Sequence, residues 1–171
     1  MDIKALRRRC EHVLDEVDIP DPFDVDTFAA TIADRRQRPL HLLPKQTPVG
    51  PCGVWLALPA ADYVFYENGT SSLHREHIIL HELGHLLGEH EAHESVDDEV
   101  LRELLPGLDL AVIHRILGRT SYSAAEEQEA EMIASMVLER VGRRGAPAAR
   151  GTRHDDVIDR LTVTLGGDQT R

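Results

Sequence analysis

The sequence predicts an α+β fold in which a small antiparallel sheet packs against one central helix and the second half of the chain is helical. Short β-prone runs separated by Pro and Gly occupy residues 39–68. On both sides of this region, apolar residues recur at helical spacing. A chain of 171 residues can bury a sizeable core. We therefore expect one domain over residues 1–141, followed by a flexible linker and C-terminal tail over residues 142–171.

Two helices are expected before the sheet. The first is predicted from the apolar positions Ile3, Leu6, Cys10, Val13, Leu14 and Val17. It should end near Asp18, because Pro20 and Pro22 follow. Asp24 can cap the second helix, which should stop before Pro39.

Three strands and a central helix are expected next. The strands are the runs Leu40–Leu43, Val54–Leu58 and Tyr63–Tyr66. After the turn at Asn68-Gly69, one of residues 70–72 can cap a helix that continues to about His90.

The second half carries further helix signals. Residues 95–98 and 123–126 both resemble capping boxes, and a short helix is expected between Asp109 and Gly118. From Gly142 the chain reads GRRGAPAARGTR, a composition typical of linkers, and one weak helix is expected around Val157–Leu165.

Composition narrows the classes of partner. A net charge of -11 disfavours direct binding to nucleic acid. The alternative is a local basic cluster in the tail, formed by Arg143, Arg144, Arg150 and Arg153, but no clear recognition helix accompanies it. No apolar run approaches the roughly 20 residues of a membrane span.

The expected location of the protein is the cytoplasm. The N-terminus has charged residues where a signal peptide needs its apolar stretch. Cys10 and Cys52 are too few for a disulfide scaffold, and we interpret both as small buried apolar groups with reduced thiols.

The main motif is His81-Glu82-Leu83-Gly84-His85 in the central helix. Residues four apart lie on one helix face, so His81 and His85 can bind one metal ion while Glu82 stands beside it. Zinc lowers the pKa of bound water to roughly 7, and a nearby carboxylate can take its proton. Glu82 is therefore the candidate general base. Gly84 costs helix stability, which a close approach of backbone or substrate would explain.

A catalytic zinc normally takes a third protein ligand, and three residues compete for this role. Glu127 lies on a helix whose Ala130 admits a close approach. Glu91 ends the run HELGHLLGEHE, which follows the metzincin pattern HExxHxxG until the third ligand, where metzincins have His. His90 is one residue out of that register. His77 lies too far along the helix axis to share one ion with both His81 and His85.

The segments HELGH and EQEAEMIASMVL together resemble the ImmA/IrrE family of metallopeptidases, and more loosely other gluzincins. The resemblance covers roughly Pro39 to Leu138. It implies a zincin-like fold with Glu127 as third ligand and Glu131 in an outer role. The alternative is that the acidic residues Glu126, Glu127, Glu129 and Glu131 form a solvated face near the start of a helix. For Glu126 we prefer this interpretation, as capping partner of Ser123.

The expected function is that of a zinc-dependent endopeptidase with one ion per chain, although a His₂Glu site also accepts manganese. The resemblance implies a regulatory protease that cleaves a DNA-binding repressor of helix-turn-helix type. Tyr66 and Tyr122 are candidate donors to the oxyanion, and the strand Tyr63–Tyr66 is a candidate edge for an extended peptide. The alternative is a non-catalytic metal-binding module that sequesters a regulator.

Overall fold

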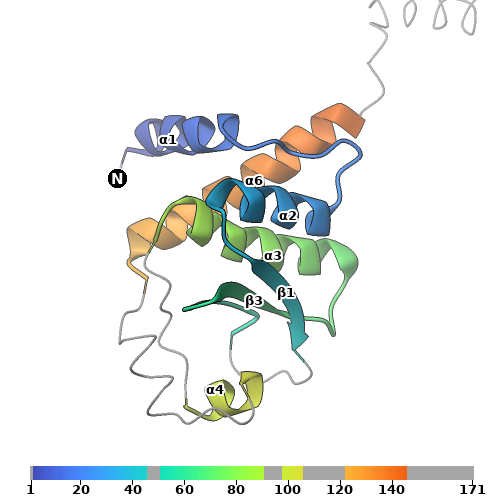
Figure 1. Ribbon diagram of the computed structural model, residues 1–171. Helices are drawn as coiled ribbons and strands as arrows, with labels where there is room; N and C mark the ends of the chain where they lie inside the picture. Colours follow the sequence, from blue (N-terminus) through green and yellow to red (C-terminus); the bar gives the residue numbers. More distant parts are fainter. Residues whose placement is uncertain (1, 46–50, 91–97, 106–121, 146–171) are drawn as a thin grey trace, which may run out of the picture. The chain divides into compact units, whose positions relative to one another are not determined.

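The computed structural model describes residues 2–45, 51–90, 98–105 and 122–145. It confirms the α+β class, and the chain from Met1 to Val141 forms one compact unit. The elements in chain order are α1 (Ile3–Asp15), α2 (Val25–Arg36), β1 (Leu40–Lys45), β2 (Gly53–Leu58), β3 (Ala61–Glu67), α3 (Ser72–Leu87), α4 (Asp98–Leu104) and α6 (Ala124–Gly145) (Figure 1).

Side-chain caps begin the helices close to where the sequence predicts. The backbone N–H of Thr27 donates to Asp24 at 2.7 Å, and that of His74 donates to Ser71 at 3.3 Å. Ser123 and Glu126 form a reciprocal capping box at the start of α6, with bonds of 2.7 and 3.3 Å. Such caps satisfy amide groups that have no partner within the helix. Glu126 therefore has the predicted capping role.

The first helix is shorter than predicted. α1 ends at Asp15 rather than near Asp18, yet Val17 remains buried in the core. The apolar period thus continues past the point where the backbone leaves the helix, which explains the difference.

The sheet is mixed, and the prediction of a purely antiparallel sheet is wrong. The strand order is β1-β3-β2. β2 and β3 form an antiparallel hairpin, whereas β1 pairs with β3 in parallel. β1 skips the strand that follows it in sequence and pairs with the next, which runs in its own direction. Short apolar runs do not encode which strand becomes the partner.

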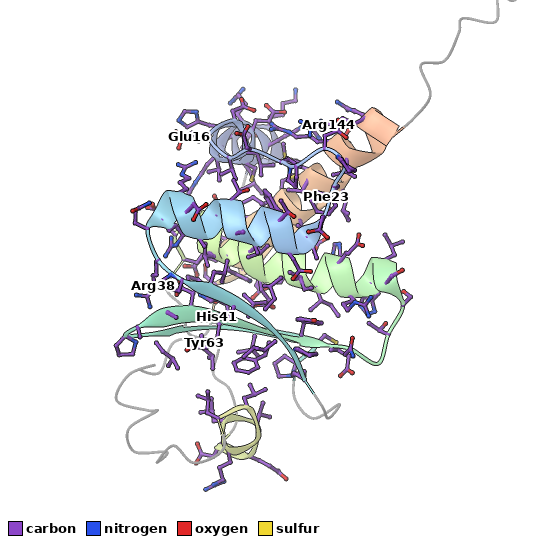
Figure 2. All side chains as sticks on the ribbon, turned by 45° about the vertical axis from the view of Figure 1, so that its right-hand side comes forward. Glu16, Phe23, Arg38, His41, Tyr63 and Arg144 are labelled. Atoms are coloured by element: carbon purple, nitrogen blue, oxygen red, sulfur yellow. The ribbon has the colours of Figure 1, made fainter. Side chains whose placement is uncertain are left out.

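The two faces of the sheet pack against different helices. Trp55 and Val64 join the main core with residues of α1, α2, α3 and α6. The alternate positions Val54, Leu56 and Phe65 form a second cluster with Leu101 of α4. Side chains of a strand alternate between its faces, so β2 is buried on both sides. Figure 2 shows the sheet between the α2–α3 layer and α4, with His41 and Tyr63 on neighbouring strands.

The two cysteines differ in exposure. Cys10 of α1 is fully buried, with its Sγ 3.9 Å from the carbonyl oxygen of Glu129. Cys52 is exposed immediately before β2. The prediction that both are buried is therefore correct for Cys10 and wrong for Cys52, which precedes the strand whose side chains enter the core.

Iodoacetamide is expected to alkylate Cys52 in the native protein near pH 8 and Cys10 only after unfolding. Burial, and to a smaller extent Glu129, raises the pKa of Cys10 to about 11. The thiolate is the reactive form, so it is scarce at that pH as well as inaccessible. Intact-mass spectrometry should detect one adduct in the native protein and none in native Cys52→Ser. Two native adducts in the wild type would contradict this assignment.

Several predicted segments lie outside the described residues. These are the capping box at Ser95, the short helix after Asp109, and the tail beyond residue 145 with its weak helix. Residues 142–145, predicted as the start of a linker, still belong to α6. None of the helices in the described ranges combines the length and apolar character that crossing a membrane requires.

Candidate metal centre

α3 and α6 approach each other closely at two small residues. A Cβ on Gly84 would lie 2.7 Å from the carbonyl oxygen of Ala130 and 2.9 Å from its Cα. The expected close approach at Gly84 is thus a contact between two helix backbones. Glu127 stands one turn before Ala130, so the approach brings it to the face of α3 that carries His81 and His85.

His81, His85 and Glu127 form one group of possible metal ligands, with one donor atom of each within 4.8 Å of the others. The two Nε2 atoms are 3.1 Å apart. The carboxylate of Glu127 lies 3.4 Å from Nε2 of His81 and 3.7 Å from Nε2 of His85. The competing candidate Glu91 lies outside the described residues.

The Nδ1 atoms of the two histidines face other partners. Nδ1 of His81 lies 3.5 Å from the carboxylate of Glu131. The same carboxylate binds Nε2 of His77 at 3.1 Å, so His77 pairs with Glu131 and is not part of the ligand group. Nδ1 of His85 lies 2.9 Å from Nδ1 of His90. Both Nε2 atoms therefore point toward Glu127.

His85 is held in its neutral form. The side chain is 1% exposed, and the ring of Tyr122 stacks on it with centroids 3.7 Å apart and 11° between the planes. Burial, followed by the neighbouring His81 and His90, lowers the pKa of His85 to about 3. A histidine must be neutral to bind a metal, so this environment favours the ligand form.

The two candidate tyrosines occupy different places. Tyr122 lies at the centre through its stacking on His85. Tyr66 of β3 packs against the main core instead. Of the two, only Tyr122 contacts a member of the ligand group among the described contacts.

The side chain of Glu82, a residue of α3, lies against Gly53, the first residue of β2. It is only 5% exposed, and a Cβ on Gly53 would lie 2.4 Å from its Oε1. Gly53 thus leaves room for the carboxylate. A pocket of about 250 Å³ beside it is lined by Pro51, Cys52, Gly53, His77, Ile78, His81, Glu82 and Glu131.

A second pocket borders the group on the side of α1. It has a volume of about 560 Å³ and is lined by Ile3, Leu6, His81, Glu127, Gln128, Glu131, Met132 and Ser135. His81 and Glu131 belong to both pockets. The ligand group therefore borders two pockets. One lies beside the start of β2, and the other is lined by apolar side chains of α1 and α6.

The predicted peptide-binding edge is wrong for β3. This strand is the central one and pairs on both sides, so its backbone groups are used within the sheet. β2 is the edge strand that begins beside Glu82. The alternating pattern of a strand predicts its faces but not its place in the sheet.

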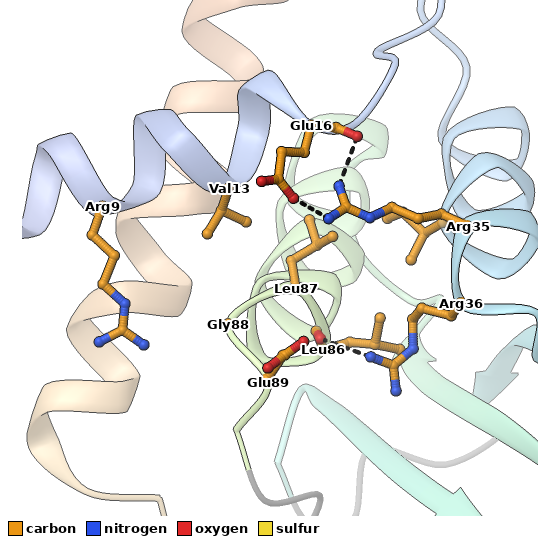
Figure 3. A pocket seen from close by; sticks show the side chains of 10 residues that line it. Arg9, Val13, Glu16, Arg35, Arg36, Leu86, Leu87, Gly88 and Glu89 are labelled. Carbon is orange, nitrogen blue, oxygen red and sulfur yellow. Dashed lines mark hydrogen bonds and ion pairs between the residues drawn. The ribbon is translucent and has the colours of Figure 1, made fainter.

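A separate pocket of about 190 Å³ lies where α1, α2 and the end of α3 meet (Figure 3). Its arginines are engaged: Arg35 donates to the carbonyl oxygen of Glu16 at 2.6 Å, and Arg36 donates to that of Leu86 at 3.4 Å. No member of the ligand group lines this pocket. We assign it no part in the candidate metal centre.

Two polar residues beside the ligand group, His90 and Glu129, are buried. The solvated-face interpretation therefore does not hold for Glu129. Glu129 precedes Ile133 and Val137 at intervals of four, so helical spacing places it on the buried stripe of α6. For His90 we find no comparable signal, because it follows the end of α3.

Comparison of this chain with known protein families, with curated proteins and with solved structures gave no match.

Proposed function

We propose that this chain is a zinc-dependent endopeptidase. The observation that supports this most is the meeting of His81, His85 and Glu127 from two helices, with the buried carboxylate of Glu82 next to His81 on α3. Two imidazoles and one carboxylate are the ligand set of catalytic zinc in several metallopeptidases. The HExxH spacing supplies the general base in the same helix.

The distances between the donor atoms suit a zinc ion. Zinc binds nitrogen and carboxylate oxygen at about 2.0–2.2 Å in tetrahedral sites, which puts two ligand atoms about 3.3–3.5 Å apart. The two Nε2 atoms are 3.1 Å apart. The carboxylate of Glu127 approaches them through different oxygens, with Oε2 at 3.4 Å from His81 and Oε1 at 3.7 Å from His85. The three residues therefore lie near the separations that one ion requires, with three protein ligands as in a catalytic site.

Each residue has a distinct role in this proposal. Zinc supplies Lewis acidity, which activates water and polarises a peptide carbonyl. Glu82 accepts the proton of the attacking water and passes it to the leaving amine. Its burial against Gly53 keeps the carboxylate at the wall of the pocket. Glu131 orients His81 through Nδ1 of that histidine.

The proposed substrate is a protein. Pockets on both sides of the ligand group provide room for side chains flanking a scissile bond. Resemblance to the ImmA/IrrE family extends the proposal to a DNA-binding repressor of helix-turn-helix type. A net charge of -11 is complementary to a basic protein of that kind.

Elemental analysis after dialysis tests the metal site. The wild-type chain is expected to hold one zinc ion, and Glu127→Ala to lose it, because removing a ligand leaves two imidazoles on one helix. Manganese loading under the same conditions would show whether the site accepts that ion too.

Two variants serve as controls. Glu139→Ala removes a carboxylate from the same helix, where Glu139 pairs with Arg7 at the surface, and should keep the zinc. Glu91→Ala should also keep it. A wild-type chain without metal, or loss of zinc in Glu91→Ala alone, would refute the site.

A further inference from the structure

A series of polar contacts runs from the ligand group to the surface of α1. Nδ1 of His85 lies 2.9 Å from Nδ1 of His90, and Nε2 of His90 lies 3.4 Å from Oε2 of Glu129. Oε1 of Glu129 pairs with Nε of Arg9 at 2.8 Å. We call His90, Glu129 and Arg9 the His90 network.

The direction of these hydrogen bonds follows from the metal site. A neutral histidine that binds a metal through Nε2 carries its proton on Nδ1. Nδ1 of His85 must then donate to Nδ1 of His90, so His90 carries its proton on Nε2 and donates it to Glu129. The contacts among His85, His90 and Glu129 agree with this single direction of donation.

The backbone after α3 is shaped to place His90 against His85. Gly88 ends the helix, and a Cβ there would lie 2.5 Å from Nε2 of His90. Glu89 has a positive φ of 55°, which is unfavourable for a non-glycine residue. The N–H of His90 then donates to the carbonyl oxygen of His85 at 3.1 Å. The turn therefore places the His90 ring against the end of α3, beside His85.

Glu129 and Arg9 complete the arrangement. The Glu129 side chain is 5% exposed, whereas that of Arg9 is 64% exposed. A buried carboxylate is costly unless it is paired and hydrogen-bonded. Arg9 of α1 supplies the opposite charge, and His90 supplies the hydrogen-bond contact through Oε2. Figure 3 shows Arg9 beside the turn at Gly88 and Glu89. Among the described residues, Oε1 of Glu129 accepts no hydrogen bond, so its contact with Arg9 is an ion pair, and this pair connects α1 to the ligand group.

We propose that the His90 network positions His85: it holds this histidine in the Nδ1-protonated tautomer, with Nε2 directed at the metal. This inference rests on the zinc site proposed above. A carboxylate or similar partner behind a metal-binding histidine fixes its tautomer and orientation, and its loss typically lowers metal affinity about 10–100-fold. Here His90 stands between His85 and the carboxylate of Glu129 and contacts both.

Zinc affinity of the full-length chain, measured by competition with a chromophoric chelator, tests the proposal. His90→Leu is expected to weaken binding about 10–100-fold. His90→Asn should restore part of the affinity, because its side-chain oxygen can replace Nδ1 as the acceptor. Glu129→Gln, which keeps the size of the side chain, should give an intermediate loss. His12→Leu removes an exposed histidine of α1 and should bind as the wild type does.

Nitrogen-15 NMR of the imidazoles provides a readout that general loss of stability would not reproduce. In the zinc-loaded wild type, His85 should show a protonated Nδ1 in a hydrogen bond, and this signature should be absent in His90→Leu and present in His90→Asn. Unchanged zinc affinity and an unchanged His85 signal in His90→Leu would overturn the positioning role alone. A wild-type chain that binds no zinc would instead overturn the proposed function, and this inference with it.

Discussion

Zinc-loaded Glu82→Gln is expected to cleave peptides about 10²–10⁴-fold more slowly than the wild-type chain, because an amide cannot accept the proton of the attacking water. Glutamine matches glutamate in size, so it fits the same space beside Gly53. The measurement is the initial rate on a library of internally quenched fluorescent peptides. Elemental analysis should find the same zinc content in both proteins, since Glu82 is not among the proposed ligands.

Glu76→Gln is a matched control on the same helix and should keep wild-type activity. Equal rates for Glu82→Gln and the wild type would contradict the role of Glu82. The alternative function, sequestration of a regulator without cleavage, predicts a different pattern. Neither protein would then cleave any peptide, and both would inactivate the regulator equally well.

Gly84→Val is expected to lower the free energy of unfolding by about 2–3 kcal/mol, the upper part of the range for overpacked cores. The atoms that a Cβ would meet, 2.7 and 2.9 Å away, belong to the backbone of Ala130. A side-chain rotation cannot relieve such contacts, so α3 and α6 must move apart. This movement also separates Glu127 from His81 and His85. We therefore expect weaker zinc binding together with lower stability in urea denaturation.

Gly142→Val provides the control within a helix. A Cβ at Gly142 would meet nothing within 4 Å, and Val and Gly differ little in helix propensity. Stability and zinc affinity should therefore stay close to those of the wild type. If Gly84→Val were as stable as Gly142→Val and bound zinc equally well, the close contact of α3 and α6 would not be what positions Glu127.

Features that depend on near neighbours in the chain were predictable. Asp24, Ser123 and Glu126 act as caps because a cap requires only the residues of one helix turn. The strands were found with small differences at their ends, but their order was not. β1 pairs with β3, and such pairing depends on the packing of the whole sheet rather than on either strand alone.

The sequence by itself determined that His81 and His85 share one face of a helix with Glu82 beside them, because the helical period places residues four apart above one another. Glu127 was one of several possible partners. Only the tertiary structure decided that Glu127 meets the two histidines, that β3 is central, and that His90 and Glu129 are buried behind His85. These features depend on contacts between segments distant in sequence, and a local period contains no information about such contacts.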